Sequence, residues 1–221
     1  MVDIFDEVDE DLRAERAQQW LKRNGWLIIA AALLIVAGAG AWQGWRWWEA
    51  KQDMAAAESF LSAQRAADAL TPASPPAARA EAAHAFEQLA ATAPAGYRTL
   101  SRLRAAALRA AAGDRAGAAS MLDAIAADSG ADPLLRDYAS LLWVQYQIDD
   151  ADAARLRARL APLTAPDNAW HALAQEASAM IALRLGQTDQ AAEILRRLAA
   201  DVTAPEGVRH RAAALLTRPG G

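Results

Sequence analysis

One segment near the start of the chain constrains the fold more than any other. From Trp26 the sequence reads WLIIAAALLIVAGAGAWQGWRWW, and no charged residue appears before Arg46. A helix rises about 1.5 Å per residue, so an uncharged stretch of about 20 residues spans about 30 Å, the thickness of a bilayer's hydrocarbon core. The segment also lacks the polar stripe of a soluble core helix. It predicts a transmembrane helix over 26–48, with a tail at 1–25 and one larger domain at 49–221.

The tryptophans support this interpretation. Six of the eight flank the apolar segment: Trp20 and Trp26 at one end and Trp42, Trp45, Trp47 and Trp48 at the other. Indole rings collect where hydrocarbon meets the lipid headgroups, because they have an apolar body and a polar N–H. We therefore expect the membrane-anchoring residues to include Trp26, Trp42, Trp45, Trp47 and Trp48.

A cleaved signal peptide is the main alternative, because Ala39-Gly40-Ala41 satisfies the small-residue cleavage pattern. The region before the apolar stretch is long and acidic, however, whereas a signal peptide begins with a short basic region. An uncleaved anchor fits better.

Basic residues near the segment predict its orientation. Four precede it (Arg13, Arg16, Lys22 and Arg23), and two closely follow it (Arg46 and Lys51). Because the cytoplasmic flank carries the excess of Lys and Arg, the N-terminus is predicted to be cytoplasmic. In a Gram-negative bacterium the chain would then be a single-pass inner-membrane protein with its C-terminal domain in the periplasm.

The N-terminal tail carries an apolar stripe on an acidic background. Phe5, Val8 and Leu12 recur at helical spacing, which predicts an amphipathic helix. This helix could bind a partner protein, or it could be a solvated or interfacial lead into the membrane. Anionic lipid should repel its acids, which slightly favours a protein partner.

Beyond the anchor the sequence is helical and repetitive. Residues 71–76, TPASPP, predict a loop. GDRAGAASMLDAIAAD from Gly113 aligns without a gap with GQTDQAAEILRRLAAD from Gly186, and weaker copies begin near Ala82 and Ala153, at spacings of about 35 to 38 residues. Two-helix repeats near 34 residues are typical of tetratricopeptide proteins. We predict an all-α solenoid of four helical hairpins, their first helices at about 53–70, 96–112, 133–147 and 167–185, with a capping helix near 206–217.

Particular residues should define each hairpin. Gly113 and Gly186 can adopt the left-handed conformation that ends a helix. Ala118, Ala153 and Ala191 should lie where paired helices approach most closely, and larger residues should fill the seam to the next hairpin (Leu122, Leu195 and Leu198). Pro166 should occupy the first turn of the helix that follows it, where its missing N–H costs nothing.

The sequence offers no chemistry of catalysis or metal binding. It has no cysteine, its histidines are isolated at His84, His171 and His210, and no nucleotide-binding or nucleophile-elbow motif occurs. The net charge is −4 and no basic face stands out, which argues against nucleic-acid binding. We therefore predict no enzyme activity, no cofactor, no metal and no small-molecule substrate. For Trp143 and Trp170, packing in the core is the simpler interpretation and contact with a binding groove the other.

From end to end, the chain resembles the tetratricopeptide-like ancillary subunit of the bacterial Sec translocon. The matching segments are DIFDEVDEDLRAERAQQWLKRNGW in the tail, GWRWWEAKQ after the membrane helix, ALRLGQTDQAAEILRRLAAD in the repeat, and the ending APEGVRHRAAALL. The repeat departs from the family pattern, with Ala106 and Ala179 at the nominal glycine positions. The resemblance implies lateral association with the Sec channel and contact with periplasmic chaperones or emerging chains.

The expected function is therefore protein binding from a membrane anchor, since stacked hairpins form an extended binding surface. A small-residue series in the anchor, Gly38, Gly40 and Gly44, could provide a close helix–helix contact in lipid or could reflect composition alone. The alternative function is an anchored scaffold or assembly factor of the cell envelope, acting in division or cytochrome maturation.

Overall fold

The computed structural model describes residues 4–217; at 4–21, 23–25 and 28 it describes the backbone alone. The described residues form helices joined by turns and loops, and they include no strand. The prediction of an all-α chain is confirmed. The chain divides into two compact units, Met1–Gln52 and Asp53–Gly221.

The first unit consists of the N-terminal part of helix α1 (Ile4–Asp68). Its described large apolar side chains are exposed, among them Leu33, Leu34, Ile35 and Val36. Among the described residues, no helix combines the length and the apolar character needed to cross a membrane. The membrane helix predicted at 26–48 stays a prediction. The side chains of Phe5, Val8 and Leu12, singled out for a tail interaction, lie outside the described ones.

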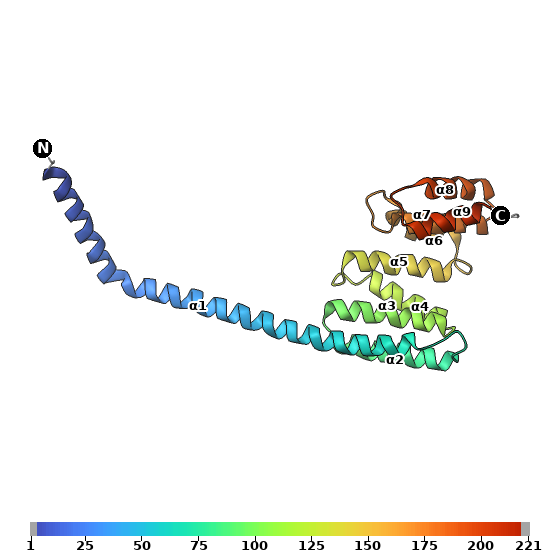
Figure 1. Cartoon of the computed structure of the whole chain (residues 1–221), viewed down its shortest axis with the longest axis horizontal. Helices are drawn as coiled ribbons and strands as arrows, with labels where there is room; N and C mark the ends of the chain where they lie inside the picture. The colour runs from blue at the N-terminus through green and yellow to red at the C-terminus, as the bar shows by residue number, and fades with distance from the viewer. Residues whose placement is uncertain (1–3, 218–221) are drawn as a thin grey trace. The chain divides into compact units, whose positions relative to one another are not determined.

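The second unit is a series of antiparallel helical hairpins (Figure 1). Residues 53–68 of α1 pair with α2, α3 with α4, α5 with α6, and α7 with α8, and α9 packs on the last hairpin. The bounds are α2 (Pro76–Thr92), α3 (Ala95–Ala111), α4 (Arg115–Ala126), α5 (Pro133–Gln147), α6 (Ala153–Leu160) with a following 3-10 turn (Ala161–Thr164), α7 (His171–Arg184), α8 (Thr188–Ala200) and α9 (Glu206–Leu216). This order of elements is consistent with the predicted α-solenoid.

Glycine makes two of the hairpin turns possible. Gly113 has φ 95° and Gly186 has φ 71°, whereas no other residue in the described part of the chain has a positive φ. In each turn the amide after the glycine donates to the carbonyl five residues back, at 2.9 Å. This is the hydrogen bond of a Schellman motif, which ends a helix by way of a left-handed residue.

The core lies in the seams between helices. Phe86 of α2 is fully buried, and its ring centroid lies 5.4 Å from that of Phe60 of α1. Further along, the largest fully buried side chains belong to successive helices: Leu122, Leu141, Leu156, Leu160, Ile181 and Leu195. Because one cluster of buried residues extends over several consecutive helices, contacts with neighbouring hairpins contribute to the stability of each hairpin.

The start of α7 differs from the prediction. The chain forms a loop at 165–170, so Pro166 does not lie in the first turn of the next helix. The Asn168 side chain accepts the backbone N–H of Trp170 at 2.8 Å and donates to the carboxylate of Asp137 at 2.8 Å. These side-chain hydrogen bonds offer the backbone an alternative to a further helical turn, which explains the later start.

Candidate protein-binding groove

The small residues predicted at the helix contacts have different surroundings. Ala118 of α4 and Ala191 of α8 are fully buried, and Leu195 is buried one turn further along α8. Ala153 is only half-buried, because it is the first residue of the short helix α6. Ala106 and Ala179 are also fully buried.

Arginine side chains join successive hairpins at a separation of one repeat. Each pair connects a helix to the equivalent helix of the preceding hairpin, over 36, 36 and 35 residues: Arg104 with Asp68, Arg159 with Asp123, and Arg211 with Glu176. Half-exposed ion pairs of this kind contribute modestly to stability, typically about 0.2–1 kcal/mol each. Their shared spacing indicates that they fix the register of one hairpin on the next.

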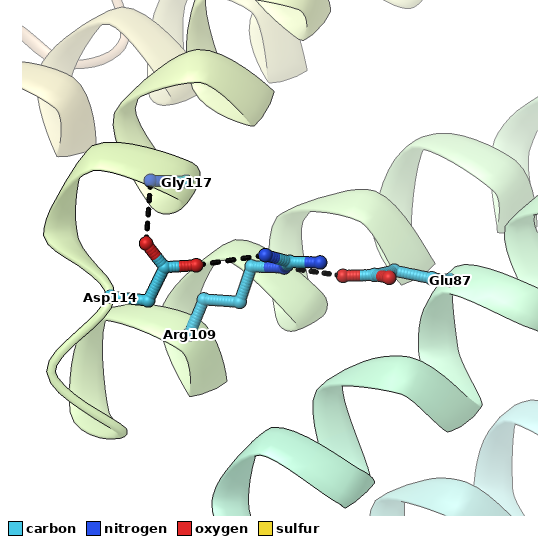
Figure 2. Close-up of polar contacts among 4 residues, drawn as sticks. All are labelled: Glu87, Arg109, Asp114 and Gly117. Carbon is cyan, nitrogen blue, oxygen red and sulfur yellow. Dashed lines mark hydrogen bonds and ion pairs between the residues drawn. The ribbon is translucent and has the colours of Figure 1, made fainter.

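A further arginine joins three helices (Figure 2). Arg109 of α3 donates from Nε to Glu87 of α2 at 2.5 Å and from a terminal nitrogen to Asp114 at 2.8 Å. Asp114 caps α4, because its other oxygen accepts the N–H of Gly117 at 2.8 Å. The hydrogen bond from the Gly117 N–H lowers the pKa of Asp114, and the hydrogen bond from Arg109 lowers it further. The hydrogen bonds to Glu87 and, to a smaller extent, to Asp114 raise the pKa of Arg109. The cluster is well satisfied internally and is best explained as a structural junction.

The two tryptophans of the second unit occupy different places. Trp143 is 2% exposed and lies in the core, with the guanidinium carbons of Arg155 and Arg159 at 4.6 and 4.5 Å from its ring centroid. Trp170 is half-buried and stacks on Tyr138 at 4.7 Å. Both therefore support packing between hairpins.

An apolar hollow in the second unit lies between α5, α7 and α9 and has a volume of about 620 Å³. We call it the α5–α7–α9 groove. Its apolar lining consists of Ile148, Leu173, Ala177, Met180, Ala214 and Leu215. The lining comes from the first helices of two hairpins and the final helix, which take equivalent positions in the repeat. Equivalent helices of stacked repeats lie side by side and form one continuous surface.

The groove carries two charges that compensate each other. Arg211 donates from Nε and from a terminal nitrogen to the two carboxylate oxygens of Glu176, at 2.6 and 2.7 Å. The Glu176 side chain is 15% exposed and that of Arg211 is 55% exposed. The carboxylate raises the pKa of Arg211. The third polar side chain of the lining is the amide of Gln145.

A second hollow, of about 560 Å³ between α2, α3 and α4, is more polar than the α5–α7–α9 groove. Three arginines line it, but Arg109 binds Glu87 as described, and Arg102 lies 3.1 Å from Asp128. With Arg98 as its remaining cation, this hollow has less apolar surface and a less distinct chemical character than the α5–α7–α9 groove.

The histidines show no metal-binding arrangement. Within the described residues, no group of three or more His, Asp or Glu side chains could hold a metal ion. The Nδ1 atom of His171 lies 2.8 Å from the carbonyl oxygen of Thr164, and His210 lies 3.6 Å from Glu206 on the same helix. His84 is exposed.

The tryptophans predicted to anchor the chain lie in the first unit, and their side chains are exposed: Trp26, Trp42, Trp45, Trp47 and Trp48. The Lys51 ammonium lies 5.4 Å from the ring centroid of Trp47. The sequence did not identify the α5–α7–α9 groove. Its residues are ordinary apolar ones from three separate helices, and only the packing of those helices brings them together.

Comparisons with curated proteins and with solved structures found no match. The family model described as a tetratricopeptide repeat-like domain matches residues 18–208, most of the chain. That range includes all four hairpins and the beginning of α9. The order of helices, the glycine turns and this match lead to one conclusion: the chain belongs to the tetratricopeptide repeat-like family.

Proposed function

We propose that this protein is a membrane-anchored module that binds other proteins. Domains of the tetratricopeptide repeat-like type serve as protein-interaction scaffolds, because stacked repeats form extended binding surfaces. The α5–α7–α9 groove is an open apolar hollow on this surface. This groove is the observation that carries the protein-binding part of the proposal.

Membrane anchoring rests on the sequence and on exposure. The large apolar side chains described over 26–48 are exposed. This exposure is unfavourable in water, because burying each CH₂ group stabilises a protein by about 0.8 kcal/mol. A lipid environment would cover them on all sides of the helix, and the flanking tryptophans suit the headgroup region. The basic flank favours an N-terminus in the cytoplasm and a C-terminal domain in the periplasm.

The more specific proposal is an accessory subunit of the bacterial Sec translocon. Its support is the resemblance in the acidic tail, in the aromatic segment after the anchor and in the repeat. The module would link the channel to periplasmic chaperones or to emerging chains.

The test is capture of partners from membranes. The full chain is extracted in mild detergent, crosslinked and analysed by mass spectrometry, beside a chain that begins at Lys51. We expect translocon subunits with the full chain only. Recovery of division or cytochrome-assembly proteins in their place would refute the translocon role and favour the scaffold alternative. Equal membrane association of the two chains would refute the anchor.

A further inference from the structure

We propose that the α5–α7–α9 groove binds an amphipathic helix of a partner protein through an uncharged apolar face of that helix. This inference deepens the proposed protein-binding function and rests on it. Three properties of the groove define the occupant: its charge, its hydrogen-bonding groups and its shape.

Charge complementarity selects an uncharged surface. The groove's two charged side chains, Glu176 and Arg211, are joined by two hydrogen bonds at 2.6 and 2.7 Å. Neither charge needs a partner from outside. A charged side chain entering beside them would lose its hydration without gaining an equivalent ion pair, and burial of an unpaired charge is strongly unfavourable. Apolar side chains meet no such penalty.

The hydrogen-bonding groups select a helix. Glu176 and Arg211 bind each other, so the amide of Gln145 is the main polar group of the lining that remains for a partner. An extended peptide would bring unpaired backbone N–H and C=O groups against apolar side chains, and each buried unpaired group costs about 1–3 kcal/mol. A helix has already satisfied its backbone internally. It can therefore place an apolar face in the groove at a lower cost.

The shape suits side chains presented at helical spacing. Ala177 of α7 and Ala214 of α9 are small, and they lie among the larger Leu173, Met180 and Leu215. Small residues among large ones form holes that receive side chains of a packed helix. Met180 is 38% exposed at this surface, and its flexible thioether adapts to varied partners. Helical partners of such grooves present apolar residues at i, i+3, i+4 and i+7.

The experiment uses the full chain in lipid nanodiscs, because detergent could itself occupy an apolar groove. The probe is a fluorescent 18-residue peptide with leucines at i, i+3, i+4 and i+7 and glutamines elsewhere. One matched peptide has the same composition in an order without the stripe, and another has a central proline. A third replaces one stripe leucine by lysine. Empty nanodiscs measure peptide binding to lipid.

Two variants that each add one negative charge test whether the peptide binds in the groove. Met180→Glu puts a carboxylate in the groove, whereas Val202→Glu puts one at a residue that is 83% exposed and does not line it. We expect Met180→Glu to weaken binding of the striped peptide at least about tenfold and Val202→Glu to leave it unchanged. Circular dichroism checks that both variants keep the helical content of the parent.

Each outcome of the experiment either supports or overturns the inference. Binding of the striped peptide alone, lost in Met180→Glu, supports the inference. Equal binding of the proline or unstriped peptide would overturn the helical occupant, and equal binding of the lysine peptide would overturn the uncharged face. No binding beyond empty nanodiscs, or an unchanged affinity of Met180→Glu, would overturn the groove as the site. Any of these results with translocon subunits still captured by the full chain would refute this inference while leaving the proposed function standing.

Discussion

The hairpin glycines allow a backbone effect to be measured without any steric contribution. At Gly113, Gly186 and Gly96 an added Cβ would meet no atom within 4 Å. Only the first two have a positive φ, of 95° and 71°, while Gly96 lies in the first turn of α3. Substitution by alanine therefore changes the backbone preference and the entropy of the unfolded chain, with no clash in any of the three variants.

The expected effects differ in sign. An L-residue in the left-handed conformation costs about 1–2 kcal/mol. The φ of Gly113 lies further outside the left-handed region open to other residues than that of Gly186, so Gly113→Ala should cost more, about 1–2 kcal/mol against about 1 kcal/mol. Gly96→Ala should stabilise the protein by up to about 1 kcal/mol, because alanine reduces the freedom of the unfolded chain.

Urea unfolding, monitored by far-ultraviolet circular dichroism, measures the order of stability of the three variants. With an m-value of about 2 kcal/mol/M, a loss of 1–2 kcal/mol lowers the midpoint by about 0.5–1 M, provided that the m-value is unchanged. A midpoint for Gly113→Ala at or above that of Gly96→Ala would refute the argument from the turns. A larger loss for Gly186→Ala than for Gly113→Ala would refute the dependence on φ.

Three further predictions concern the second unit. Phe86→Ala should lower the free energy of unfolding by about 3–5 kcal/mol, since the ring is fully buried, and a urea midpoint within 0.5 M (about 1 kcal/mol) of the parent would contradict this. Ser101→Ala should be neutral or stabilising by up to about 1 kcal/mol in the same assay, because this hydroxyl is buried without a hydrogen-bond partner in the described structure; a clear loss would show that a partner exists. The Gly117 N–H lowers the pKa of Asp114, so the stability that this carboxylate contributes is present above its unfolded pKa, about 3.9, and disappears as the pH falls through the folded pKa. Thermal unfolding of Asp114→Asn should therefore show a smaller loss of Tm between pH 5 and 3 than the parent, and parallel losses would contradict that role.

Sequence periodicity predicted the helices well because each hairpin repeats a similar pattern of apolar and turn residues. Gly113 and Gly186 recur in one frame, and both have a positive φ. The predicted start of α7 was wrong because Asn168 bonds to a residue on another helix, Asp137, which a local pattern cannot reveal. Boundaries that depend on such contacts need the folded chain.

The sequence by itself determined the all-α class, the repeat frame and the composition that argues against catalysis and metal binding. These follow from residue types and from spacings along one helix. The tertiary structure decided which side chains share a surface. Gln145, Met180 and Ala214 are far apart in the chain and belong to three helices, yet they line one groove. Their proximity depends on how each hairpin packs on the next, and that packing is a property of the whole array of helices.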